Sequence, residues 1–243
     1  MIGIVPNAGV GHRYYFSCTA ALQRVILSMM SSINLTIRNE GGKDYRAVEQ
    51  LIREAFWNLY VPGCNEHIII HNLRKSSDFI PELDFVAEKE GLIVGQIVYS
   101  RGIIKMQRGE EKEVIGFGPV SVLPAFQKQG IGSTLINHTI NLAKNMGYSA
   151  ICIYGDPRYY SRLGFRCAEK YDIRTSDAKF AVALQVLELK KGVLNNMPGR
   201  FIESAGFAVH ENEFAQYDAT FPFKEKTENR SQQEFKLLAS LRY

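Results

Sequence analysis

Cysteine and proline are scarce in this sequence, and it lacks a hydrophobic run of membrane-spanning length. The 243 residues include four cysteines and eight prolines, and 46% of the residues are hydrophobic. An apolar stretch at residues 18–30 is interrupted by Gln23 and Arg24, so it is too short and too polar to cross a bilayer. The composition excludes a disordered chain, a collagen-like repeat and a small disulfide scaffold, and it predicts a globular protein without a membrane partner.

No two cysteines are spaced as a CxxC pair, which argues against a thiolate zinc site and a thioredoxin-type motif. We interpret them as buried, reduced thiols, which favours a reducing compartment and predicts a cytoplasmic protein. They are Cys18, Cys64, Cys152 and Cys167. The net charge of +4 is small and its Lys and Arg residues are scattered, so no nucleic-acid partner is expected. A modest positive field suits a small phosphorylated ligand equally well. Nothing in the sequence specifies the oligomeric state.

The chain divides into three parts by pattern. We interpret residues 1–34 as an N-terminal extension carrying a short helix, or as an upstream leader with Met29 or Met30 as the true start. Residues 35–192 carry the main domain, and residues 193–243 are expected to add strands and a charged tail that complete the sheet. The order of elements predicts an α/β fold with a mixed, mostly antiparallel sheet flanked by helices.

Hydrophobic periodicity and turn residues place the elements within these parts. Strands are predicted at residues 35–38, 85–99 with a tight turn at 88–91, 102–106, 114–122, 149–154 and 180–189. Helices are predicted after Asp44, at residues 66–74, and from 130 to about 146, with a tail or terminal helix from Lys224.

The most informative segment is the loop between the strand that ends near Leu123 and the helix that follows Gly132. A helix N-terminus offers unpaired amides and the positive end of the helix dipole, which together bind anions. Gly130 and Gly132 allow the backbone to approach such an anion closely, and Lys128 adds a positive charge. The loop lacks the GxxxxGK[ST] pattern of the ATP-binding P-loop and the GxGxxG pattern of dinucleotide-binding folds. A helix that begins at glycines for close packing alone is the alternative.

These residues resemble the acetyl-CoA-binding motif of the GCN5-related N-acetyltransferases (GNAT family). Residues 127–132, Gln-Lys-Gln-Gly-Ile-Gly, follow the strand residues 120–124, Val-Ser-Val-Leu-Pro. Downstream, residues 155–165 are similar to the aromatic and Gly-Phe element of the same family. Their sequence most resembles that of the bacterial YhbS-type subgroup. The resemblance covers roughly residues 35–209, and two motifs in the family's order make it specific.

The resemblance implies a GNAT-like sheet with a central splay, acetyl-CoA as co-substrate and an amine as acceptor. It implies that backbone amides on the splayed strand pair with the pantetheine arm and that the loop amides hold the diphosphate. The residues assigned to cofactor binding are Val120, Ser121, Val122, Gln127, Lys128, Gln129, Gly130, Ile131, Gly132 and Ser133. Gly116, Gly118 and Pro119 are consistent with a bulge at the splay, or with a plain irregular edge strand.

Tyr160 occupies the family's usual tyrosine position, four residues before Gly164, and is the candidate general acid for the departing thiolate. Tyr159 is its rival, and both could be packing aromatics. No acidic residue lies on the central strand at residues 114–122, where the family often places a glutamate, so no general base is assigned.

His67 and His71 lie one helical turn apart, but no third ligand accompanies them, and we expect a surface or partly packed pair rather than a metal site. The leading prediction is an N-acetyltransferase acting on an amine of a small molecule or protein. The missing base leaves a non-catalytic CoA-binding regulatory module as the alternative, with a partner-binding role of the first 32 residues as a weaker one.

Overall fold

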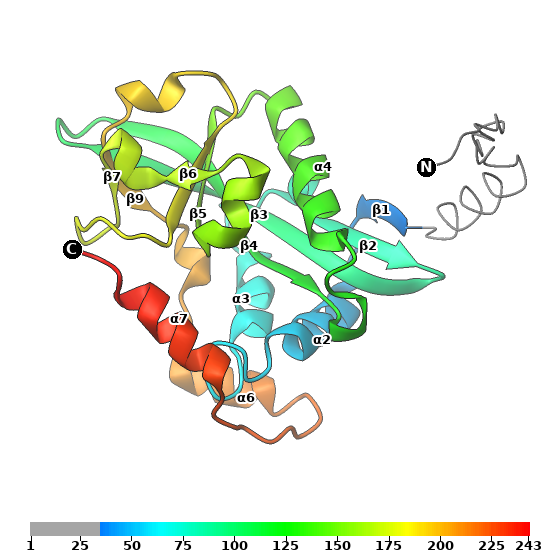
Figure 1. The fold of residues 1–243 in the computed structure, drawn as a ribbon. Helices are drawn as coiled ribbons and strands as arrows, with labels where there is room; N and C mark the ends of the chain where they lie inside the picture. The colour runs from blue at the N-terminus through cyan, green and yellow to red at the C-terminus, as the bar shows by residue number, and fades with distance from the viewer. Residues whose placement is uncertain (1–34) are drawn as a thin grey trace, which may run out of the picture. The chain divides into compact units, whose positions relative to one another are not determined.

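The computed structural model describes residues 35–243 (Figure 1). The extension or leader predicted for residues 1–34, with its helix and Cys18, lies outside the described residues. None of the helices in the described part is long and apolar enough to span a bilayer.

A mixed sheet forms the centre of the described part. Its strands are β1 (Leu35–Asn39), β2 (Phe85–Lys89), β3 (Leu92–Met106), β4 (Glu111–Val122), β5 (Ala150–Tyr154), β6 (Arg166–Cys167), β7 (Ile173–Arg174), β8 (Leu184–Glu188) and β9 (Gly199–Ile202). They run in the order β1-β2-β3-β4-β5-β8-β6, with β9 beside β3 and β7 beside β9. Only the β4–β5 and β7–β9 pairs among these strands are parallel. The predicted mixed, mostly antiparallel sheet is therefore confirmed.

Helices cover both faces of this sheet (Figure 1). They are α2 (Tyr45–Phe56), α3 (Glu66–Leu73), α4 (Ile131–Asn145), α5 (Pro157–Tyr160), α6 (Glu211–Asp218) and α7 (Arg230–Ser240). On one face, α4 packs on β2–β5 through a buried apolar cluster. On the other face, α2 and α3 pack on Val86 and Val98. The two faces of β3 thus belong to two separate parts of the core.

The periodic apolar residues of α4 explain its position. Leu135, Ile136 and Ala143 recur at helical spacing and are fully buried against the sheet. Thr139 lies on the same face, where its hydroxyl hydrogen-bonds the hydroxyl of Tyr99 at 2.9 Å. This pair satisfies two polar groups inside the core. The middle of α4 is thereby held against β3.

β3 is longer than predicted. The sequence analysis expects separate strands at residues 85–99 and 102–106, but β3 runs unbroken from Leu92 to Met106. Gly102 continues the pairing opposite Val114, and a Cβ on it would lie 3.0 Å from the ring of Phe201. The glycine is therefore required by a close approach from β9 rather than by a strand end.

The C-terminal part departs furthest from the expected strands. The strand predicted at residues 180–189 begins only at Leu184. Residues 180–182 instead pair with the last residues of the chain, with an antiparallel bridge between Ala181 and Arg242. Within residues 193–243, β9 is the only named strand, and α6 and α7 follow it. The expected charged tail is mostly the helix α7.

Candidate functional site

The cofactor loop, residues 127–133, joins β4 to α4 and exposes a row of backbone amides. Gly130 caps α4 with a φ of +85°, and Lys128 has a φ of +60°. Both conformations turn the chain sharply, and at Gly130 no atom lies within 4 Å of where a Cβ would be. Within residues 35–243, no acceptor takes a hydrogen bond from the amides of residues 128–133. The loop therefore presents six consecutive unpaired donors at the positive end of a helix dipole.

Side chains of the cofactor loop hold its shape. Gln127 donates through Nε2 to the carbonyl oxygen of Val122 at 3.0 Å. Gln129 donates through Nε2 to the carbonyl oxygen of Ala125 at 3.2 Å. Both amides thus bind the loop itself. The exposed Lys128 has no ion-pair partner within the described residues, so its ammonium group is available to an anion.

β4 and β5 diverge next to this loop. Ile115 and Ile151 form the single residue pair between these two strands in the described sheet, so β4 leaves β5 after that point. We call the space beyond it the β4–β5 gap. The pairing with β3 shifts across Gly118 and Pro119, which indicates a bulge. The side chain of the buried Gln96 holds that bulge by donating to the Pro119 carbonyl oxygen at 2.9 Å.

The alternation of strand amides identifies which donors face the gap. The amide of Leu123 donates to the Val94 carbonyl oxygen of β3 at 2.9 Å. Because successive amides along a strand point to opposite edges, those of Val122 and Val120 point away from β3 and into the gap. The amide of Ser121 points toward β3 instead, and its buried hydroxyl accepts a hydrogen bond from Gln96 Nε2 at 3.1 Å. Of the three assigned strand residues, two therefore offer amides to a ligand in the gap.

Tyr159 and Tyr160 lie at the end of α5 with perpendicular rings, 5.0 Å apart. The hydroxyl of Tyr159 lies 3.2 Å from Ser133 Oγ, in the first turn of α4. Tyr160 packs on Phe117 and Phe165 and has no hydrogen bond from its hydroxyl within the described residues. Burial raises the pKa of Tyr160, so its phenol stays protonated at neutral pH.

A carboxylate that the sequence analysis missed lies over the same strands. Glu203 follows β9 and lines a narrow crevice with Gly116 of β4 and Cys152 of β5. Solvent reaches one side of its side chain, while the surrounding protein removes enough water to raise the pKa of Glu203 to about 7. Its negative charge also helps to raise the pKa of Tyr154. No local motif marks Glu203, because 87 positions separate it from Gly116.

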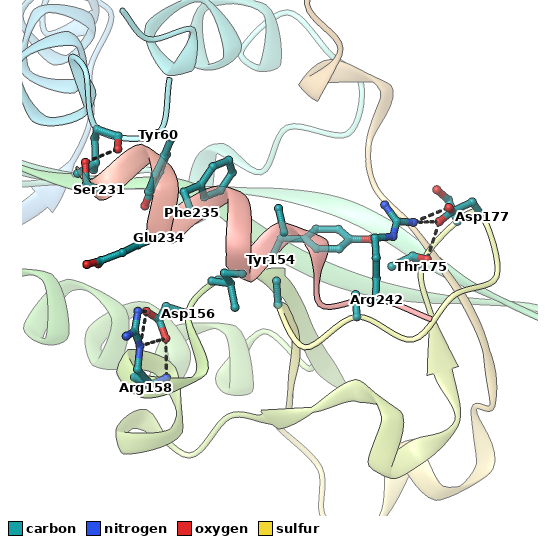
Figure 2. Close-up of a pocket in the computed structure, with 17 residues that line it drawn as sticks. Tyr60, Tyr154, Asp156, Arg158, Thr175, Asp177, Ser231, Glu234, Phe235 and Arg242 are labelled. Carbon is teal, nitrogen blue, oxygen red and sulfur yellow. Dashed lines mark hydrogen bonds and ion pairs between the residues drawn. The ribbon is translucent and has the colours of Figure 1, made fainter. Parts of the chain in front are cut away.

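A cavity of about 580 Å³ lies beside α5, and we call it the α7 cavity because residues 231–242 form one wall. Figure 2 shows Tyr60 and Phe235 at one end, Asp156 and Arg158 below them, and Arg242 beside Asp177 at the other end. The sequence analysis did not predict this cavity, since its walls come from four distant segments.

The two histidines are more deeply packed than expected. His67 is fully buried, with its ring edge against Phe221, so the predicted surface or partly packed position is wrong for it. Burial lowers the pKa of His67 to about 4, which keeps it neutral. His71 lies 3.1 Å from Glu49 and 3.0 Å from the hydroxyl of Tyr217. No group of three or more potential metal ligands is found among residues 35–243.

Comparison with known proteins gives consistent results. An acetyltransferase (GNAT) domain family matches residues 82–167. The chain is 29% identical over 166 residues to an uncharacterized N-acetyltransferase, YhbS, of Escherichia coli, covering 68% of this chain and 93% of that protein. The structure of the E. coli YhbS protein in complex with CoA is similar, with a TM-score of 0.62 and 26% identity, covering 72% of this chain and 92% of that one. A GNAT family acetyltransferase from Brucella melitensis in complex with acetyl-CoA has a TM-score of 0.58 and 30% identity, covering 72% of this chain and 99% of that one.

Proposed function

The chain belongs to the GNAT family of acetyltransferases, and on that basis we propose that it transfers an acetyl group from acetyl-CoA to an amine of a small molecule or protein. The observation that carries this proposal is the row of unpaired amides at residues 128–133. A diphosphate is the group that such a row would bind, because several N–H donors and the helix dipole converge on it. Two relatives hold CoA or acetyl-CoA, which supports the same ligand here.

The β4–β5 gap would hold the rest of the co-substrate. The amides of Val120 and Val122 face the gap and would pair with the amide groups of the pantetheine arm, as a neighbouring strand would. Gln127 and Gln129 keep the cofactor loop in shape, and Lys128 adds a charge-assisted contact to a phosphate. An amide facing the gap near Val120 would also stabilise the negative charge that develops on the thioester oxygen.

Tyr160 is the proposed general acid. When the amine nitrogen attacks the thioester carbonyl, a C–N bond forms, the C–S bond breaks and a thiolate leaves. The phenol proton of Tyr160 passes to that sulfur, and its raised pKa ensures that the proton is present beforehand. Its ring position is fixed by Phe117 and Phe165, which supports a defined direction for the hydroxyl.

Glu203 is the proposed proton acceptor for the amine. Its side chain lines a crevice with Gly116 and Cys152, next to the Ile115–Ile151 pair at which β4 and β5 diverge. The pKa of about 7 keeps a substantial fraction of Glu203 ionised at neutral pH and leaves it a competent base. The family's usual acidic residue on β4 would then be replaced by one that follows β9.

Two measurements on the purified full chain test this function. Calorimetry with acetyl-CoA measures binding to the cofactor loop, and detection of free thiol in the presence of an amine panel measures transfer. We expect binding with a Kd in the micromolar to millimolar range and thiol release that depends on the amine. Binding without amine-dependent release would favour the regulatory module, and absence of binding would contradict the assignment of the loop.

A further inference from the structure

The α7 cavity lies next to both proposed proton-transfer groups. Gly155 lines the cavity, and a Cβ at this position would lie 2.1 Å from the ring of Tyr160, so the tyrosine ring covers the backbone there. Tyr154 also lines the cavity, and its ring centroid lies 6.1 Å from that of Phe201. Burial and the nearby charge of Glu203 raise the pKa of Tyr154. Residues in contact with Tyr160 and near Glu203 therefore form one wall of the cavity.

Aromatic and aliphatic side chains form most of the cavity wall. Tyr60 and Phe235 stack with ring centroids 4.6 Å apart, and Leu238 extends this surface along α7. Such a wall favours a ligand with an apolar, flat body, because aromatic faces bury large areas and stack on one another. The volume of about 580 Å³ lies within the usual range for small-molecule sites.

The carboxylates that line the cavity are all paired. Asp156 pairs with Arg158, and Asp177 pairs with Arg242, as Figure 2 shows. Glu234 also lines the cavity and pairs with Arg230 at 3.1 Å. Charge is therefore balanced around the cavity, and its apolar surface is the feature that selects a ligand.

The wall formed by α7 is attached to the rest of the domain at both ends. Ser231 donates to the Leu59 carbonyl oxygen at 2.6 Å near its start, and the Ala181–Arg242 bridge fixes the residues after it. α7 is therefore a fixed wall of the cavity.

We infer that the α7 cavity is the acceptor site and that the acceptor is a small primary amine carried on an aromatic body. The inference rests on the proposed acetyl transfer and adds the substrate class to it. α7 then determines acceptor specificity, although it takes no part in holding acetyl-CoA.

The test compares acceptors and fills the cavity. We would measure kcat/KM by thiol release with 2-phenylethylamine, with ethylamine and with a short lysine peptide as acceptors, and acetyl-CoA binding by calorimetry. Ala239→Trp places an indole in the cavity from an exposed position of α7, so the helix is expected to fold normally. Leu237→Trp is the matched control, because Leu237 is 63% exposed and does not line the cavity.

We expect 2-phenylethylamine to be favoured over ethylamine by at least about tenfold, since apolar contacts in a pocket give discrimination of this order. Ala239→Trp should lower the kcat/KM for 2-phenylethylamine at least about tenfold without changing acetyl-CoA affinity. Leu237→Trp should change neither quantity. Equal use of the two amines, preference for the peptide, or an Ala239→Trp variant that behaves like the control would overturn the acceptor assignment. Absence of acetyl-CoA binding by the unmodified protein, or binding without turnover of any amine, would instead overturn the proposed acetyl transfer.

Discussion

Tyr159 and Tyr160 are neighbours in sequence, but their hydroxyls serve different parts of the site. Their rings are perpendicular, and only Tyr159 hydrogen-bonds the first turn of α4, through Ser133. Tyr160 packs instead on β4 and lies against Gly155 at the end of β5. In the proposed function, Tyr159 would thus lie at the diphosphate end of the site and Tyr160 at the end where the acetyl group would lie.

Phenylalanine substitutions separate these two roles. Tyr160→Phe keeps the ring that packs on Phe117 but removes the proposed acid, so kcat should fall by about 10²-fold while acetyl-CoA affinity is unchanged. Tyr159→Phe removes the contact to Ser133 and should weaken acetyl-CoA binding a few-fold with little change in kcat. Steady-state kinetics and calorimetry on both variants check this. An unaffected kcat in Tyr160→Phe would exclude it from the mechanism.

Two glycines at opposite ends of α4 provide a test of the cofactor loop. Gly130 and Gly147 have φ values of +85° and +91°, and at both no atom lies within 4 Å of where a Cβ would be. Valine at either position should cost about 1–2 kcal/mol or more of stability, because the left-handed conformation disfavours a side chain. Only Gly130→Val should also weaken acetyl-CoA binding, by at least about tenfold, because only that site adjoins the exposed amides.

Thermal unfolding and calorimetry on the two variants measure these effects together. Similar losses of stability with a loss of affinity confined to Gly130→Val would support the loop assignment. If both variants bind acetyl-CoA as the unmodified chain does, the diphosphate does not lie on this loop.

The proposed role of Glu203 makes a prediction about pH. A base must be ionised to act, and the pKa of about 7 means that the ionised fraction of Glu203 rises as the pH passes through neutrality. With the acceptor saturating, kcat should therefore rise between pH 6 and pH 8 and then level off, apart from the ionisation of the amine itself. Glu203→Gln should lower kcat by about 10²-fold and remove this rise.

Glu213→Gln is the control for loss of one negative charge, because Glu213 is an exposed residue of α6. It should keep both the rate and the pH profile. If Glu203→Gln keeps the rise of kcat between pH 6 and pH 8, another group causes that rise. Glu203 would then not be the proton acceptor.

The parts of the site that the sequence predicts are contiguous in the chain. Residues 120–133 contain a strand end, a turn and a helix start, and the chemistry of such a unit is set by local backbone geometry. The position of Gly130 at the start of α4 could therefore be deduced from residue types and spacing, whereas Tyr160 is identified only through the resemblance to the family. Their roles toward acetyl-CoA stay predictions until they are measured.

Contacts between residues far apart in the chain could not be predicted from the sequence. Glu203 reaches β4 because β9 inserts beside β3, and nothing near Glu203 specifies that insertion. The α7 cavity likewise requires Leu59 and Ser231 to meet across 172 positions. The residues at 180–182 have the composition of a strand, but they pair with the chain terminus rather than with β5, since tertiary context determines which partner a short apolar segment finds.

A buried carboxyl group outside the site should make stability depend on pH. The side chain of Glu40 is fully buried, and it accepts a hydrogen bond from Arg74 at 2.5 Å. Burial first, and then the neighbouring charge of Asp84, raise the pKa of Glu40 from its ordinary value of 4.5 to about 9. The folded protein therefore keeps a proton that the unfolded chain has lost between these two values. Stability from this group is fully present below pH 4.5 and is lost as the pH rises toward 9, by up to about 1.4 kcal/mol per pH unit.

Glu40→Gln cannot ionise, so it should abolish this dependence. Urea unfolding at pH 5.5 and pH 8.5 would measure the free energy of unfolding of the unmodified chain and of the variant. Relative to Glu40→Gln, the unmodified chain should lose stability between these two pH values, because it must either hold a proton or bury a second charge beside Asp84. Glu82→Gln, at an exposed position, should track the unmodified chain. Parallel behaviour of Glu40→Gln and the unmodified chain would mean that Arg74 keeps the Glu40 carboxylate ionised in the folded protein throughout.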